Sequence, residues 1–304
     1  MRQLILLPAI GATCLLAGCG GGGSGGVSAI PTPPSPAANG EFTPDAASKT
    51  ISVSQHLTLN ATQTATSDRS VELPGTQVQI TYDRATDSYS ITDGIRSQSF
   101  LPSSLSSSQV ASQDVTGSKL FKNFAGGGSD YLGIFKAPAT VYGITLSYSN
   151  YGYWQQNSAA ANGTSIKVSY FTFGSPTPLS DMPRTGSATY KAAGSGNLID
   201  DAHIYVVENT ANMTADFAAG NVNLTIISSG KDLLQGFITG VPPFNLSTSI
   251  SSNGFEGPLS AGQVGWAGTI KGQFYGPQAA EVGIVYSATS PTATMTGALV
   301  GQKK

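Results

Sequence analysis

The sequence predicts an all-β protein, and three observations support that fold class. Glycine contributes 37 and proline 17 of the 304 residues, whereas charged residues make up only 11%. Strong helix formers are never periodic over a dozen residues, so no long amphipathic helix is expected. Several segments instead alternate apolar and polar residues between Gly-, Pro- or Asn-containing turns, which is typical of antiparallel strands.

The first 18 residues are predicted to be a lipoprotein signal peptide. The chain begins MRQLILLPAIGATCLLAGCG, with a basic Arg2 followed by an apolar run from Leu4 to Leu16. That run is too short to form a stop-transfer helix that spans a bilayer. Residues 1–18 are therefore expected to direct export and to be removed.

A lipid anchor is predicted at Cys19. The residues Leu16-Ala17-Gly18-Cys19 match the lipobox of bacterial lipoproteins. Acyl chains on Cys19, palmitate among them, would hold the protein in a lipid bilayer. The alternative is an ordinary secretory signal with an incidental cysteine. Gly20, in the place where an Asp would favour inner-membrane retention, makes the outer membrane the expected location.

Cysteine content and charge exclude several classes of function. Cys14 would leave with the signal and Cys19 would be acylated, so no free thiol is expected in the mature chain. Disulfides, zinc-thiolate sites and a cysteine nucleophile are then excluded. The net charge of −2 at pH 7 argues against a nucleic-acid partner.

No catalytic or metal-binding constellation is predicted. His56 and His203 are the only histidines, and neither a Gly-x-Ser-x-Gly nor a His-Glu-x-x-His motif occurs. His203 follows Asp200 and Asp201, and a His–carboxylate pair for acid–base chemistry is the alternative to a solvated histidine at a strand edge. The acidic residues lack metal-loop spacing. We therefore expect a protein that is not an enzyme.

Composition divides the exported chain into three parts. Residues 19–48 are rich in Gly, Pro and Ser and predict a disordered tether. Residues 49–175 predict a β-rich N-terminal domain, within which QVQITYDRATDSYSIT (77–92) has the pattern of a hairpin. A Pro/Gly/Ser-rich hinge at 173–186 leads into a C-terminal domain over residues 181–304.

The C-terminal domain shows the clearer strand alternation. In GWAGTIKGQFY, Trp266, Ile270 and Phe274 share one face, with Gly268 and Gly272 between them. We expect about eight strands in this part of the chain. Eight antiparallel strands can close into a barrel whose interior is filled by side chains, where bulky and absent side chains alternate. An open two-sheet sandwich is the competing arrangement.

The segment QFYGPQAAEVGIVY (273–286) predicts a strand interrupted by one helical turn. Gly276 lets the chain leave the ladder, and Pro277 suits the first position of a turn because that position needs no N–H. We expect the turn to close one end of the barrel; a loop without a role is the alternative. Ala279 and Ala280 are expected to lie against the barrel mouth. Glu281 is expected to accept backbone N–H groups there, and Gly283 to restore the extended geometry.

Four segments resemble the β-barrel domain of transferrin-binding protein B, which is similar to the barrel of factor H-binding proteins. Ile284 departs from the family pattern, where a second glycine is usual. The resemblance covers about residues 181–304. Its structural motif includes Gly186, Tyr190 and Tyr275 in addition to the residues of the interrupted strand. The segments are MPRTGSATYKAAG (182–194), ADFAAGNVNLTI (215–226), GFEGPL (254–259) and GQFYGPQAAEVGIVY (272–286).

The resemblance implies an eight-stranded barrel preceded by a handle-like β domain, on an outer-membrane lipoprotein displayed at the cell surface. Such proteins bind macromolecular partners or haem. The full transferrin receptor carries two handle–barrel pairs, whereas this chain has room for one. We therefore expect a binding protein with a single lobe, with transferrin itself not the expected partner. Exposure to the periplasm instead of the cell exterior remains open.

Exposed aromatic residues are the predicted ligand contacts, because interface hot spots favour Tyr and Trp. Tyr151, Tyr153 and Trp154 lie in YSNYGYWQQ, and Phe244 lies in VPPFNL. The same segments could offer an apolar pocket to haem or an iron chelate, which is the alternative ligand class. Aromatic side chains in β-proteins also commonly form cross-strand pairs and core. Apart from haem, no cofactor is expected.

Overall fold

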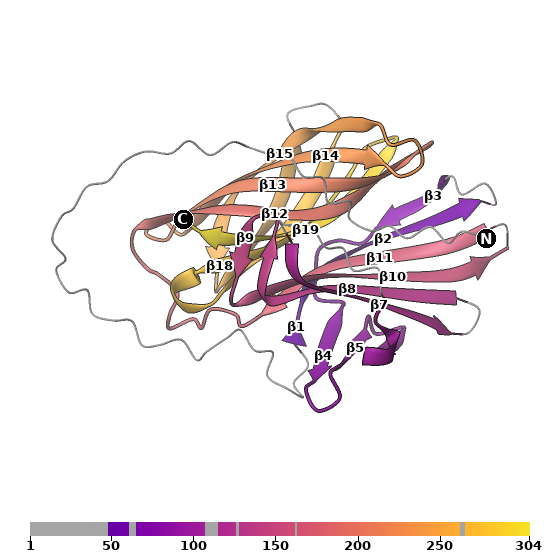
Figure 1. Cartoon of the computed structure of the whole chain (residues 1–304). Coiled ribbons are helices and arrows are strands. Elements are labelled where there is room, and N and C mark those ends of the chain that lie inside the picture. The colour runs from indigo at the N-terminus through magenta and orange to yellow at the C-terminus, as the bar shows by residue number, and fades with distance from the viewer. Residues whose placement is uncertain (1–47, 61–64, 107–114, 126–127, 162, 262–264) are drawn as a thin grey trace, which may run out of the picture.

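The computed structural model describes residues 48–60, 65–106, 115–125, 128–161, 163–261 and 265–304. The predicted signal peptide, the acylated Cys19 and all of the predicted tether except Ser48 lie outside these ranges. Within them the chain is all-β and forms three layers: a small sheet, a seven-stranded sheet and a closed barrel (Figure 1). No helix of the described residues is both long and apolar enough to span a membrane.

The small sheet contains the predicted hairpin of residues 77–92. Ile80 pairs with Ile91 and Tyr82 with Tyr89, so the apolar side chains of both strands share one face. At the turn, the carboxylate of Asp83 accepts the N–H of Ala85 at 2.8 Å. The strands, in the order in which they pair, are β1 (Ser48–Lys49), β4 (Gln79–Asp83), β5 (Ser88–Thr92) and β6 (Ser97–Phe100).

The seven-stranded sheet is the middle layer and is covered on both faces. One face packs on the small sheet and the other on the outside of the barrel. A short 3₁₀ turn, η1 (Pro102–Ser104), precedes its edge strand β7. In pairing order the sheet contains β3 (Ala65–Val71), β2 (Ile51–Asn60), β11 (Gly163–Gly174), β10 (Ser149–Ala160), β8 (Gly128–Val141) and β7 (Val115–Ala125), with β9 (Ile144–Leu146) paired to β8.

The C-terminal part is a closed barrel of eight antiparallel strands that pair in chain order. This confirms the predicted barrel, and the alternative of an open sandwich is wrong. The first strand closes the barrel by pairing with the last, for example Gly194 with Leu299. The strands are β12 (Ser187–Asp200), β13 (Ile204–Asp216), β14 (Asn221–Asp232), β15 (Ile238–Ser251), β16 (Gly254–Ala261), β17 (Ala267–Tyr275), β18 (Glu281–Thr289) and β19 (Ala293–Lys303).

Side chains fill the barrel, as its small strand number requires. Ile270 and Phe274 are buried in its core, and Trp266 packs against that core from the mouth. A Cβ atom at Gly272 would lie 2.1 Å from the ring of Phe255, so the glycine makes room for an aromatic side chain. Bulky and absent side chains therefore alternate inside the barrel.

Candidate functional site

The interrupted strand forms two barrel strands, β17 and β18, joined by the 3₁₀ turn η2 (Pro277–Ala279). Gly276 leaves the ladder with a φ of 72°, a conformation that favours glycine. Ala279 is buried in the barrel core, where its carbonyl oxygen accepts the hydroxyl of Tyr190 at 2.6 Å. The turn therefore closes this end of the barrel.

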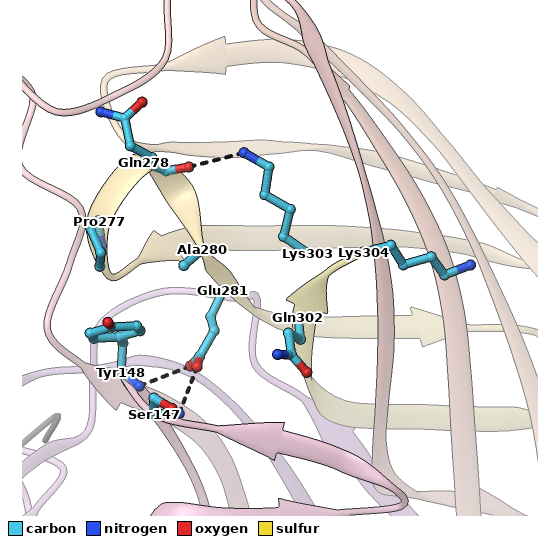
Figure 2. A pocket seen from close by; sticks show the side chains of 9 residues that line it. All are labelled: Ser147, Tyr148, Pro277, Gln278, Ala280, Glu281, Gln302, Lys303 and Lys304. Atoms are coloured by element: carbon cyan, nitrogen blue, oxygen red, sulfur yellow. Dashed lines mark hydrogen bonds between the residues drawn. The ribbon is translucent and has the colours of Figure 1, made fainter. Parts of the chain in front are cut away.

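Glu281, directly after the turn, binds the layer next to the barrel rather than the barrel mouth. Its carboxylate accepts the backbone N–H groups of Ser147 and Tyr148 at 2.6 and 3.1 Å (Figure 2). It also accepts the N–H of Ser149 at 2.8 Å. The hydroxyl of Ser149 donates a further hydrogen bond at 2.7 Å. Burial raises the pKa of Glu281, and the hydrogen bonds from Ser149, Ser147 and Tyr148 oppose that shift.

A pocket of about 330 Å³ opens beside this carboxylate, between the turn and the C-terminal residues. The ammonium of Lys303 reaches the carbonyl oxygen of Gln278 at 3.4 Å, while Lys304 extends away from the turn (Figure 2). Asp181 holds the turn from its other side by accepting the N–H of Gln278 at 2.9 Å. Protein groups satisfy the buried carboxylate of Glu281, so we interpret this region as a structural junction.

The four aromatic residues predicted to be exposed ligand contacts are all buried, which corrects that expectation. Tyr151 and Tyr153 point from β10 toward the barrel, and Tyr151 shares a short hydrogen bond with Ser195 of β12. Trp154, on the opposite face of β10, packs on the small sheet. Phe244 points into the barrel core against Trp266, with ring centroids 5.7 Å apart. None of the four is available at the surface.

Both histidines pair with carboxylates, His56 within the seven-stranded sheet and His203 at the β12–β13 turn of the barrel. His56 Nε2 lies 2.8 Å from Glu72 Oε1, and His203 Nδ1 lies 3.4 Å from Asp200 Oδ1. The Asp200 carboxylate also accepts the N–H groups of Ala202 and His203, so it stabilises the β12–β13 turn. No group of three or more metal-ligating side chains is present in the described parts of the chain.

Near His203, the structure exposes an apolar surface that the sequence had not singled out. We call it the tip surface and define it as His203, Tyr205, Leu234, Phe237 and Ile238. Its three apolar residues are exposed: Leu234 to 58%, Phe237 to 40% and Ile238 to 72% of their surface. The ring of Phe237 stands edge-on to both other rings, with centroids 5.2 Å from His203 and 5.7 Å from Tyr205.

Two neighbouring turns build the tip surface. In the β14–β15 turn, the buried carboxylate of Asp232 accepts the N–H of Leu234 at 2.9 Å, and Gly236 takes a φ of 75°. The N–H of Leu233 donates to the carbonyl of Ile204 at 3.0 Å, which joins this turn to the start of β13. Alternate connections of an up-and-down barrel lie at opposite ends, so the tip surface lies at the end opposite η2. Four large apolar residues around a Gln-Gly turn in DLLQGFI were the available sequence signal.

A phenol and an arginine–carboxylate pair lie close to the tip surface. Burial, followed by the nearby Asp200, raises the pKa of Tyr205 to about 12, so its phenol is uncharged at physiological pH. Arg69 of β3 contacts Asp201 at 2.6 Å and donates to the carbonyl of Thr292 at 2.7 Å. The seven-stranded sheet thereby fixes this end of the barrel. Such a surface suits apolar protein contacts better than acid–base chemistry.

The barrel is similar in sequence to the barrels of a known family. Residues 182–303 match the family model described as the C-lobe and N-lobe beta barrels of Tf-binding protein B. The predicted resemblance is confirmed for this part of the chain. The family motif around the interrupted strand is therefore the structural junction of η2 and Glu281.

Individual transferrin-binding proteins are also similar to this chain. Transferrin-binding protein B of Haemophilus influenzae (strain 86-028NP) is 29% identical over 170 residues, which cover 49% of this chain and 26% of the relative. The chain thus spans about a quarter of that relative's length. A transferrin-binding protein B double mutant from Haemophilus parasuis Hp5 has a TM-score of 0.48 at 16% identity, covering 83% of this chain and 45% of its own. The Neisseria meningitidis protein has a TM-score of 0.43 at 17% identity, covering 84% and 43%.

Proposed function

We propose that this chain is a non-catalytic binding protein, lipid-anchored through Cys19 in the outer membrane and displayed at the cell surface, which holds a protein partner on the tip surface. The observation that supports this most directly is the exposure of Leu234, Phe237 and Ile238 on a turn fixed by hydrogen bonds. Exposed apolar residues grouped on a rigid element are typical of protein-binding surfaces.

The energetics favour Phe237 and Ile238 as the anchors. Burying a fully exposed side chain of this size contributes about 1.5–3 kcal/mol, and most of the surface of Ile238 is still free to be buried. Phe237 already packs on His203 and Tyr205, so binding would cost it little conformational entropy.

The family match supports a binding role, since the matched model and the relatives carry the name transferrin-binding protein. We extend that role to this chain only as a macromolecular partner of protein chemistry. Transferrin is the first candidate to test because it is the partner named for the relatives. Haem is a second candidate, to be detected by a Soret band in the purified protein.

Two measurements test the proposal. Protease shaving of intact cells should remove the protein while a periplasmic control protein survives. Protection until lysis would contradict surface display. If the protein is displayed on the cell surface, the full chain should capture a protein partner from host fluids. Binding of purified transferrin should be tested separately.

The tip surface itself is tested by the double variant Phe237→Ser/Ile238→Ser. We expect about tenfold weaker capture or more, with an unchanged thermal unfolding midpoint. Leu179→Ser is the matched control, because Leu179 is also 60% exposed but lies in the connector before the barrel. Equal capture by the double variant and the control would contradict the assignment of the tip surface.

A further inference from the structure

A second surface with a different chemistry lies on the wall of the barrel. A hollow of about 490 Å³ crosses the outer faces of β13 to β16. Its polar side chains are three Asn, two Thr and two Ser, and none of its lining residues is charged. The wall of the barrel therefore offers an uncharged surface that is both hydrogen-bond donor and acceptor. Six of the lining residues present amides or hydroxyls on β13 to β16: Asn212, Asn223, Thr225, Asn245, Ser247 and Ser260.

The strand register arranges these side chains in two rows. In the first, Asn212, Thr225, Asn245 and Ser260 stand opposite one another on four successive strands. In the second row, Asn223 pairs with Ser247. Adjacent strands lie about 4.8 Å apart, so each row presents an amide or hydroxyl at that interval.

Most of this hydrogen-bonding capacity is free in the described structure. Thr225 donates to the side-chain oxygen of Asn245 at 2.9 Å, and Ser260 donates to the Asn245 carbonyl at 3.3 Å. The amides of Asn212 and Asn223 and the hydroxyl of Ser247 are exposed, and no side-chain partner within the described residues engages them. These groups are available to a ligand.

The strand ladder is also interrupted beside the hollow. Strands β15 and β16 pair at Phe244–Asn245 and again at Ile250–Ser251, in the same register, but the residues between are not paired. Pro258 of β16 lacks an N–H and cannot donate to the ladder. The hydroxyl of Thr248 donates a hydrogen bond to the backbone carbonyl oxygen of Glu256 at 2.8 Å. The interruption leaves further backbone groups outside the ladder at the edge of the hollow.

We propose that this wall of the barrel binds a neutral oligosaccharide. A sugar offers hydroxyl groups that both donate and accept, which is what uncharged amides and hydroxyls recognise. An anionic or cationic ligand would find no opposite charge among the lining residues. An extended peptide would find no row of apolar pockets for alternate side chains. The site is separate from the tip surface and does not depend on it.

A glycan array probed with the labelled full chain tests this inference. The array carries neutral oligosaccharides, sialylated and sulfated oligosaccharides, and uncharged Gly-Ser peptides as probes. We expect binding to at least one class of neutral oligosaccharide and none to the peptides. The double variant Asn223→Ala/Asn245→Ala should reduce that signal by about fivefold or more, since each lost hydrogen bond weakens binding severalfold.

Thr210→Ala is the matched control, because Thr210 is exposed on the same barrel but does not line the hollow. The tip variant Phe237→Ser/Ile238→Ser should bind oligosaccharides normally, which separates this site from the proposed protein partner. Absence of binding to every neutral oligosaccharide would overturn the inference. So would binding to charged glycans or peptides alone, or an undiminished signal from a folded double variant with an unchanged unfolding midpoint.

Discussion

Glu281 accepts both the backbone N–H and the hydroxyl of Ser149, at 2.8 and 2.7 Å, although the two residues are 132 positions apart in the chain. Ser149 begins the central strand β10, and Glu281 begins the barrel strand β18. A single carboxylate therefore joins the barrel to the sheet beside it. Removing it would leave several buried or half-buried N–H groups without an acceptor.

Glu281→Ala should lower the free energy of unfolding by about 3 kcal/mol, because hydrogen bonds to a buried carboxylate are lost together. Glu281→Gln should lower the free energy of unfolding by less, because the side-chain amide oxygen can still accept hydrogen bonds from the backbone N–H groups. Urea denaturation measures both. Glu256→Ala is the control: this exposed residue pairs only with Lys271 at the surface, so its loss should change stability by about 0.5 kcal/mol or less. An alanine variant at 281 as stable as the wild type would contradict the junction.

Gly272→Ala should destabilise the barrel by about 1–3 kcal/mol, because the new Cβ atom would meet the ring of Phe255 at 2.1 Å. Adding Phe255→Leu should recover part of the loss by making room. Thermal unfolding of the single and double variants measures this coupling. Gly240→Ala is the control, since nothing lies within 4 Å of its added methyl group. Additive effects of the two changes would show that the ring contact is not the cause.

The small sheet should be held to the central sheet by charges that acid removes. Burial alone would raise the pKa of Asp93, but hydrogen bonds from Arg96, Gln156 and Lys167 lower it to about 2. Lys167 of the central sheet contacts Asp93 and also Glu72, which follows β3 of that same sheet. The hydrogen bond to His56 is the largest cause that lowers the pKa of Glu72, also to about 2. Both folded-state values lie below the ordinary ones. Their stabilisation is therefore present above about pH 4.5 and is lost as the pH falls toward 2.

Asp93→Asn tests this dependence. At pH 6 the variant should be less stable than the wild type by about 1–2 kcal/mol, and the difference should shrink toward pH 2.5. Asp130 acts in the opposite direction, because burial raises its pKa and its protonation in acid relieves that cost. The charge of Asp93 is one of the causes that raise the pKa of Asp130, so the variant also reduces this opposing contribution. A difference independent of pH would show that Asp93 is not stabilised as a carboxylate.

Trp154 should emit blue-shifted fluorescence that iodide quenches weakly, because it is fully buried between the two sheets. The variant Trp266→Phe leaves Trp154 as the only tryptophan and isolates its signal. The complementary variant Trp154→Phe should report the half-exposed Trp266 and be quenched more strongly. Strong quenching of Trp154 would mean that it is exposed after all.

The aromatic residues of β10 show why burial could not be predicted from the pattern. A strand covered on one face alternates apolar and polar residues, but a strand covered on both faces does not. Tyr153 and Trp154 are neighbours that point in opposite directions, one onto the barrel and one onto the small sheet. Only the presence of both layers distinguishes them from exposed aromatic contacts.

The tip surface shows the converse difficulty. Leu234, Phe237 and Ile238 have the composition of core residues, yet no element of the described structure covers them. A sequence pattern records which residues are apolar, but exposure depends on what packs against them. The apolar turn was visible in DLLQGFI, and its exposure required the structure.

The all-β class, the eight strands of the barrel and the position of the interrupted strand could be predicted from the amino-acid pattern. These features follow from local chemistry: alternation of side chains, the missing N–H of Pro277 and the positive φ of Gly276. Tertiary structure alone decided which aromatic residues are buried, which amides Glu281 accepts and which apolar turn stays exposed. Those outcomes depend on contacts between segments distant in the chain, such as Glu281 and Ser149, which are 132 positions apart, and no local pattern encodes them.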